Sequence, residues 1–171
     1  VAKIGLAFQM SVIAWSQNLT RERAEDCGAS YATRAELLSQ SDIVTIHLRL
    51  SDRTRGLLGA RDLVLMKPTA YLVNTSRGPI VDEAALIDAL ERKAIGGAGL
   101  DVFDKEPLPL DHPLRRLDNT IITPHLGYVT AEGYRGMFTQ AVENVRTFLE
   151  GQPTRVLNPA VLERPNPRRI S

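Results

Sequence analysis

The apolar residues along the chain alternate between two spacings. Short runs rich in β-branched residues are separated by longer segments in which apolar positions recur every three or four residues. The short runs are typical of strands buried on both faces, and the longer segments are typical of helices. This alternation predicts βαβ units and a parallel sheet. The predicted strands cover residues 11–15, 43–47, 70–74, 97–101 and 120–123.

One predicted helix carries signals at both ends. Asp82 is a good N-cap for it, because a carboxylate can accept hydrogen bonds from the exposed backbone N–H groups of a first turn. Val81 and Leu86 have the spacing of a hydrophobic staple. Gly96 and Gly97 are expected to end this helix.

The longest predicted helix covers residues 130–150. Its apolar side chains, from Tyr134 to Leu149, fall on one stripe, which is expected to pack against the sheet. Shorter helices are predicted over residues 20–26 and 33–39.

The opening segment is unusual for a doubly wound fold. Residues 1–10 look helical and run directly into the first predicted strand. A dinucleotide-binding βαβ unit would instead begin with a strand and a G-x-G-x-x-G turn, and that motif does not occur in the sequence. The chain also begins with Val1 rather than Met, so we expect it to be part of something longer.

Composition narrows the class of protein. The 171 residues are 43% hydrophobic and 24% charged, with a formal net charge of +1, which is typical of a globular protein. This balance gives no reason to expect nucleic acid or a membrane surface as a partner. Cys27 is the single cysteine, so we expect no disulfide and no metal site, and a reducing cytoplasm as the compartment.

Polar residues follow three of the predicted strands, where ligands bind in open α/β sheets. Arg77 comes just after the strand that ends near residue 74 and is followed by Gly78 and Pro79, so a tight turn should hold it. The planar fork of a guanidinium suits a substrate carboxylate. A surface arginine in a turn is the simpler alternative.

The other two stretches supply carboxylates and an imidazole. Asp101, Asp104 and Glu106 follow one strand, although a solvated loop explains Asp104 beside Lys105 as well. His125 follows the last strand, and histidine is a residue type that can exchange a proton in a reaction at pH 7. A lone histidine is more often structural. His112 fits a loop, and His47 fits either strand-end packing or a cofactor lining.

The order of these stretches matches one family. NTSRGPIVDEAAL, AGLDVFDKEPLP and TPHLGYVT resemble the signature segments of the D-isomer-specific 2-hydroxyacid dehydrogenases, in their nucleotide-binding domain. The resemblance implies an α/β fold with a Rossmann-like, doubly wound parallel sheet that lacks its first strand and glycine-rich loop. The absent strand would be central and would leave a gap in the sheet. Residues 1–157 would form a partial NAD(P)-binding domain, and residues 158–171 a poorly ordered C-terminal tail.

The resemblance also implies residue roles. Arg77 would hold the substrate carboxylate, and His125 would exchange the hydroxyl proton while hydride passes to or from the nicotinamide. Glu106 would pair with His125, and Asp101 would contact the nicotinamide end. The implied cofactor-binding residues are Ser16, His47, Leu48, Thr75, Ser76, Asp101, Gly127 and Tyr128.

Two positions depart from the family pattern. Ser16 stands where the family usually has an acidic residue that binds the ribose 2′-hydroxyl, so with Arg21 or Arg23 it would tolerate a 2′-phosphate. The implied cofactor is therefore NAD or NADP. Arg49 stands where the family usually has an apolar residue or proline. Its side chain would either crowd the adenine side of the cofactor cleft or point to solvent.

The function implied is that of a D-2-hydroxyacid dehydrogenase. Hydride would pass between NAD(P) and a small 2-hydroxy or 2-oxo acid, with this chain as the catalytic portion of a cytoplasmic homodimer. The alternative is a non-catalytic truncated chain or an NAD(H)-sensing interaction module.

Overall fold

The computed structural model describes residues 1–163. The chain divides into two compact units, Val1–Gly127 and Tyr128–Ser171. The first contains both sheets and all helices except those that follow residue 130.

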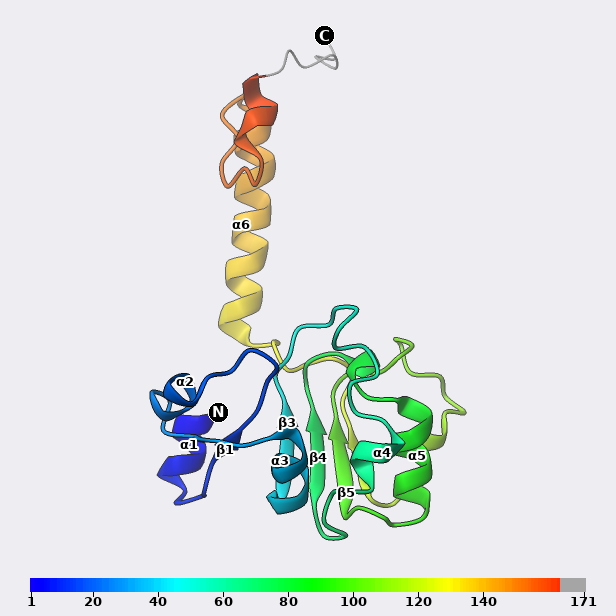
Figure 1. Cartoon of the computed structure of the whole chain (residues 1–171). Helices are drawn as coiled ribbons and strands as arrows, with labels where there is room; N and C mark the ends of the chain where they lie inside the picture. Colours follow the sequence, from blue (N-terminus) through cyan, green and yellow to red (C-terminus); the bar gives the residue numbers. More distant parts are fainter. Residues whose placement is uncertain (164–171) are drawn as a thin grey trace. The chain divides into compact units, whose positions relative to one another are not determined.

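A four-stranded parallel sheet forms the centre of the first unit (Figure 1). Its strands lie side by side in chain order, and Val44, Leu72, Ala98 and Thr120 are in register across it. The sequence predicted all four strands. They are β3 (Ile43–Ile46), β4 (Tyr71–Asn74), β5 (Gly97–Leu100) and β6 (Thr120–Ile122).

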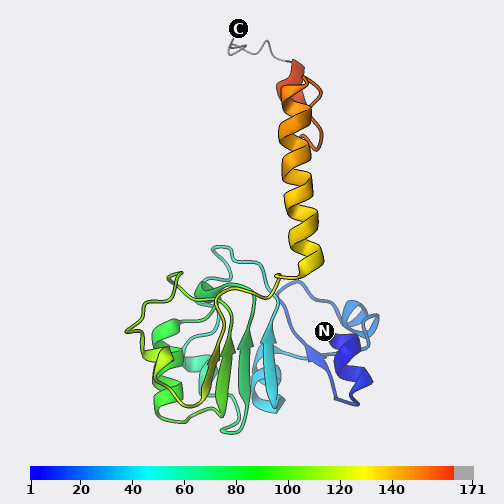
Figure 2. The ribbon, with the colours of Figure 1, turned by 180° about the vertical axis from the view of Figure 1, so that it is seen from behind.

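Helices cover only one face of this sheet within the first unit (Figures 1 and 2). The prediction that both faces of the strands are buried is therefore wrong here. Ile43, Tyr71 and Ile121 keep 49%, 54% and 75% of their surface exposed, whereas Leu72 is fully buried. The covering helices are α3 (Arg34–Gln40), α4 (Ala60–Leu63), which the sequence did not predict, and α5 (Glu83–Glu91).

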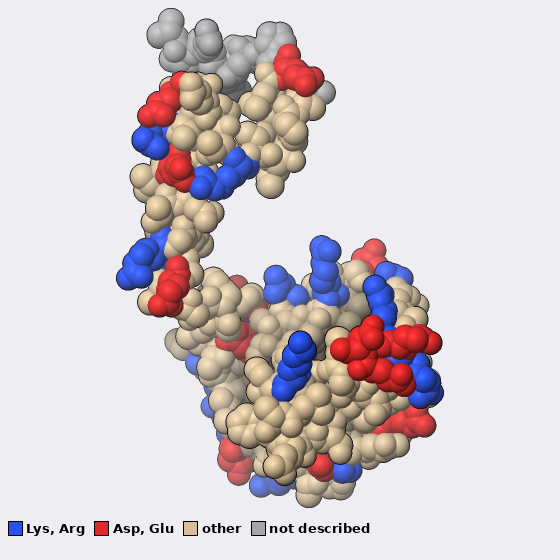
Figure 3. All heavy atoms as spheres, turned by 90° about the vertical axis from the view of Figure 1, so that its left-hand side faces the viewer, with Lys and Arg blue, Asp and Glu red and all other residues tan. Residues whose placement is uncertain are grey.

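A second, two-stranded sheet lies beside the first. Its strands pair in parallel and are only two residues long, and they share no hydrogen-bonded ladder with β3. The gap expected from the resemblance is present as a groove of about 270 Å³, lined by Ile13 and Ala14 on one side and by Val44 and Ile46 on the other. Figure 3 faces this end of the unit, where a broad uncharged surface is edged by charged side chains. The elements here are α1 (Ala2–Ala7), β1 (Ile13–Ala14), α2 (Arg21–Glu25) and β2 (Ser30–Tyr31).

Helix α5 begins as predicted and ends differently. Asp82 accepts a hydrogen bond from the Ala85 N–H at 3.0 Å, which confirms the N-cap. The helix ends at Glu91 rather than near Gly96 and Gly97, and Lys93 (φ 52°) adopts a left-handed conformation after it. Gly97 instead lies in β5, where a Cβ atom would approach the Asn119 carbonyl oxygen to 2.6 Å.

The second unit contains α6 (Ala131–Leu149), which Thr130 caps by accepting from the Gly133 N–H at 2.9 Å. Its apolar stripe includes Val142 and Phe148, which are 70% and 65% exposed. The predicted tail begins with a 3-10 helix, Pro159–Glu163, and its residues 164–171 lie outside the described residues. No helix within residues 1–163 has the length and apolarity to cross a lipid bilayer.

Candidate active site

The turn that carries Arg77 is held by a buried amide at the end of β4. Asn74 is 1% exposed, and its Nδ2 donates to the Arg77 carbonyl oxygen at 2.9 Å. Its Oδ1 accepts from the Ser76 N–H at 3.1 Å. Asn74 is not among the site residues predicted from the sequence. The signal was an amide closing an apolar strand, since a buried amide needs hydrogen-bond partners and finds them in the following turn.

The Arg77 guanidinium remains available for a ligand. Its Nη1 donates to the Ser76 carbonyl oxygen at 2.6 Å, and among residues 1–163 it takes part in no salt bridge. Gly78 follows it at a close approach of backbones, because a Cβ atom there would lie 2.1 Å from the Phe103 carbonyl carbon. The Arg77 turn is therefore packed directly on the loop that follows β5.

That loop brings Glu106 to His125. The His125 Nδ1 lies 2.7 Å from the Glu106 Oε2, and because an ionised carboxylate can only accept, Nδ1 is the donor. The other carboxylate oxygen of Glu106 accepts from the Phe103 N–H at 3.0 Å. Burial acts to raise the pKa of Glu106, but these two hydrogen bonds and the charges of His125 and Arg77 outweigh it and hold that pKa below its usual value.

Asp101 holds the segment that contains His125. Its side chain is 5% exposed and accepts from the Thr123 hydroxyl, and from the N–H groups of Leu126 and Gly127 at 2.8 Å each. Burial acts to raise the pKa of Asp101, but the three hydrogen bonds together with the charge of His125 outweigh it and hold that pKa below its usual value. His125 itself has a φ of 58°, a left-handed conformation that costs about 1–3 kcal/mol and persists only where the surrounding structure holds it. The hydrogen bonds of Asp101 to Leu126 and Gly127 contribute to holding it.

The remaining predicted cofactor residues lie at three places: in the loops after β3 and β4, in the segment after β6, and in a pocket after β1. Ser76 donates its hydroxyl hydrogen to the Leu48 carbonyl oxygen, which joins the loops after β4 and β3. His47 follows β3, and its Nε2 lies 3.0 Å from the Thr45 hydroxyl, while Thr75 is exposed. Gly127 is held by Asp101. Tyr128 belongs to the second unit. No group of three or more potential metal ligands occurs in the described part of the chain.

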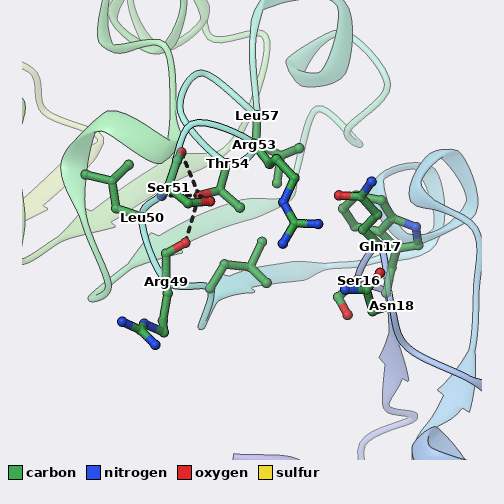
Figure 4. A pocket seen from close by; sticks show the side chains of 11 residues that line it. Ser16, Gln17, Asn18, Arg49, Leu50, Ser51, Arg53, Thr54 and Leu57 are labelled. Atoms are coloured by element: carbon green, nitrogen blue, oxygen red, sulfur yellow. Dashed lines mark hydrogen bonds between the residues drawn. The ribbon is translucent and has the colours of Figure 1, made fainter.

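Ser16 lines a separate pocket of about 340 Å³, together with Gln17 and Asn18 after β1 and the 48–54 loop after β3 (Figure 4). The arginines of this pocket are Arg49 and Arg53, whereas Arg21 lies over the ring of Tyr31, 5.6 Å from its centroid. In Figure 4 the Arg53 side chain points toward Gln17, and the Arg49 guanidinium points away from Ser16 and Gln17.

The family is decided by the match of the first unit. The family described as D-isomer specific 2-hydroxyacid dehydrogenase, NAD binding domain, matches residues 1–127. The chain belongs to this family. The match confirms the resemblance found in the three signature segments, and the structural neighbours confirm the Rossmann-type α/β fold.

Relatives with known names agree with the assignment of the chain to this family. A glyoxylate reductase of Aeropyrum pernix is 44% identical over 164 residues, which are 95% of this chain and 49% of that protein. The crystal structure of a phosphoglycerate oxidoreductase from Vibrio cholerae o395 matches with a TM-score of 0.81 at 38% identity, over 88% of this chain and 48% of that one. A D-lactate dehydrogenase from Aquifex aeolicus, solved with NAD and lactic acid, matches with a TM-score of 0.74 at 34% identity, over 89% and 50%. The chain thus spans about half the length of these dehydrogenases and reductases.

Proposed function

We propose that this chain is the nucleotide-binding and proton-transferring portion of a D-2-hydroxyacid dehydrogenase that reduces a small 2-oxo acid of the glyoxylate class. The observation that carries the proposal is the 2.7 Å contact between His125 Nδ1 and Glu106 Oε2, beside an arginine that takes part in no salt bridge within the described chain. An oriented imidazole and a guanidinium fork are the groups that the reduction of a 2-oxo acid requires.

The nicotinamide cofactor would supply or accept the hydride, and the residues of the chain would do the rest. Arg77 would bind the substrate carboxylate through its fork and so orient the 2-oxo group. His125, held through Nδ1 by Glu106, would give a proton from Nε2 to the carbonyl oxygen as that oxygen becomes a hydroxyl. Glu106 would stabilise the imidazolium from which the proton comes, and Asp101 would keep the His125 backbone in place. The predicted contact of Asp101 with the nicotinamide remains part of this proposal, beside its observed role in the loop.

The test is glyoxylate-dependent oxidation of NADH and NADPH, measured for the protein that contains this chain. His125→Ala should lower turnover by about 10²–10⁴-fold while leaving cofactor affinity within a few fold, because the imidazole acts on the substrate proton. Glu91→Gln, an exposed carboxylate on α5, serves as the matched control. Near-normal turnover of the His125 variant, or no activity of the parent toward any 2-oxo acid, would contradict the proposal. Nucleotide binding without turnover would favour the NAD(H)-sensing alternative.

We further propose that the cofactor site accepts a 2′-phosphate, and hence NADPH as well as NADH. Ser16 carries no charge that would repel a phosphate, and Arg53 reaches the same pocket from the facing loop (Figure 4). The hydroxyl of Thr54 holds this loop, since it accepts from the Ser51 N–H at 2.8 Å and donates to the Arg49 carbonyl oxygen at 2.7 Å. A guanidinium on an ordered loop is suited to binding a phosphate.

The probes for this second test are 2′,5′-ADP and 5′-AMP, titrated into the 171-residue chain by calorimetry. We expect 2′,5′-ADP to bind on the order of 10-fold more tightly, which corresponds to about 1.4 kcal/mol. Arg53→Ala should remove that preference, and Arg49→Ala, whose guanidinium points away, should keep it. Equal affinities in the parent chain, or loss of the preference only in the Arg49 variant, would refute the proposal.

We also propose that the protein acts as a cytoplasmic homodimer. The exposed apolar stripe of α6, which includes Met137 and Phe138, is a surface of the kind that subunit association buries. Cys27 is an exposed free thiol, which is compatible with a reducing compartment. Light scattering of the protein at micromolar concentration tests the dimer, and a monomeric mass would contradict it.

A further inference from the structure

A second carboxylate–imidazole pair lies beneath the loop that carries Glu106. Glu83, the first residue of α5, places its Oε1 3.1 Å from the Nε2 of His112. Both side chains are largely buried, with 21% of Glu83 and 16% of His112 exposed. Neither residue belongs to the proposed proton-transfer group, and each comes from a different element.

The tautomer of His112 follows from its neighbours. Its Nδ1 accepts from the Leu114 N–H at 3.4 Å, at the start of the 3-10 helix Pro113–Arg115. A backbone N–H can only donate, so Nδ1 carries no proton and Nε2 does. The neutral imidazole therefore donates to Glu83 while it caps the helix, and both of its nitrogens are used.

The Glu83 carboxylate holds the loop at both ends. Its Oε2 accepts from the Asp104 N–H at 3.3 Å, and its Oε1 accepts from His112. Glu106 lies between these two attachment points. Arg115 secures the middle of the loop, donating to the carbonyl oxygens of Leu108 and Pro109 at 2.9 and 2.8 Å. Partial burial, followed by repulsion from Glu83, raises the pKa of Asp104, in agreement with a carboxylate placed under this loop.

We propose that Glu83, through Asp104 and His112, is a positioning residue that keeps Glu106 in contact with His125. This role rests on the proposed function for its importance in catalysis, but the geometry can be tested without a substrate. The Phe103 N–H and the His125 imidazole both donate to Glu106. We expect these two hydrogen bonds to depend on the conformation of residues 104–112. Releasing the ends of that segment allows the carboxylate to move away from both donors.

The competing explanation is that Glu83 only stabilises the first turn of α5, as acidic residues at helix N-termini do. The two roles predict different results. A first-turn residue changes the stability of the fold and leaves the native environment of Glu106 unaltered. A positioning residue changes the pKa of Glu106 and the protection of the Phe103 amide in the native state.

The experiment compares Glu83→Ala, Glu83→Gln and His112→Asn in the 171-residue chain, with Glu91→Ala as the control on the same helix. Asparagine keeps an oxygen that can cap residues 113–115 but is too short to reach Glu83, so this variant separates the two functions of His112. The Glu106 carboxyl carbon is titrated by NMR, and exchange of the Phe103 amide with solvent deuterium is followed at neutral pH.

In the three variants we expect the pKa of Glu106 to rise toward its ordinary value, and Phe103 exchange to accelerate on the order of 10-fold. The control should change neither. Unchanged Glu106 titration and Phe103 exchange in folded variants would overturn the proposal and leave Glu83 as a first-turn residue. If the alanine variant does not fold, Glu83→Gln and His112→Asn decide the question by the same readouts. Loss of the proposed enzymatic activity in a separate assay would not affect this result, because no substrate is involved.

Discussion

The two sheets of the first unit consist of the same kind of parallel strand, yet they differ in what covers them. The β3–β6 sheet lies on a continuous apolar cluster that includes Leu72, Ile80 and Leu90, each 1% exposed or less. None of residues 1–36 belongs to this cluster. Around the β1–β2 sheet the buried apolar side chains are the alanines Ala24, Ala29 and Ala32.

This difference divides the proposed site into a part for proton transfer and a part for binding the cofactor. The residues proposed for proton transfer follow strands of the sheet that lies on the apolar cluster, whereas Ser16 follows a strand whose other edge has no partner in the structure. Because burial of apolar area is the main stabilising contribution, the β1–β2 side should be the weaker part of the unit. The adenosine side of the proposed cofactor site therefore rests on the less stable sheet.

Truncating one apolar side chain in each sheet should give the largest difference in stability between the two sheets. Leu72→Ala should lower the free energy of unfolding by about 3 kcal/mol, because it leaves a cavity at a position that is fully buried. Ile13→Ala, at a half-buried position facing the groove, should cost less than about 1 kcal/mol. Urea denaturation followed by circular dichroism measures both values. Equal losses would show that the two sheets are equally important for stability.

Asp101→Asn tests the packed side at the proposed site itself. An amide offers one acceptor oxygen and presents N–H groups where the Leu126 or Gly127 N–H now donates, so we expect a loss of about 2 kcal/mol. The matched variant Asp111→Asn changes an exposed carboxylate in a loop and should be nearly neutral. A loss below about 0.5 kcal/mol for Asp101→Asn would contradict the role assigned to the carboxylate.

The same variant should alter the pH dependence of stability. The pKa of Asp101 is lowered in the folded chain. The stability that the ionised carboxylate contributes is therefore complete above the ordinary pKa of an aspartate, about 4. That contribution is lost as the pH falls through the lowered folded value. The parent chain should therefore lose stability more steeply than Asp101→Asn on acidification. Parallel curves for the two proteins would argue against this linkage.

Helix caps provide the smallest contrast. Asp82→Ala removes the cap of α5 on the packed side and should lower the free energy of unfolding by about 1 kcal/mol. Thr20→Ala removes the cap of α2, which lies on the weaker side. In the parent chain the Thr20 hydroxyl accepts from the Arg23 N–H at 3.3 Å. We expect the variant to accelerate amide exchange within α2 and to change global unfolding by less than about 0.5 kcal/mol. Equal effects of Asp82→Ala and Thr20→Ala on global unfolding would mean that α2 unfolds only together with the rest of the unit.

The sequence by itself determined the strands of the main sheet, the Asp82 cap and the family, because these depend on local apolar spacing and on short contiguous motifs. It also placed Arg77, Glu106 and His125 at the ends of strands, and the carboxyl ends of parallel strands meet at one edge of a sheet. Only the tertiary structure decided how these residues are held. The Asp101 hydrogen bonds, the Gly78 contact with Phe103 and the placing of Arg53 in the pocket of Ser16 join segments that no local pattern connects.

The errors have a related physical cause. Apolar spacing shows that a side chain can be buried and does not show what covers it. The exposed face at Tyr71 was therefore predicted to be buried. A glycine pair was likewise expected to end α5, although Lys93 supplies the left-handed residue and Gly97 is needed where backbones approach closely. Burial and close approach depend on segments distant in the chain, and these properties only the assembled fold could decide.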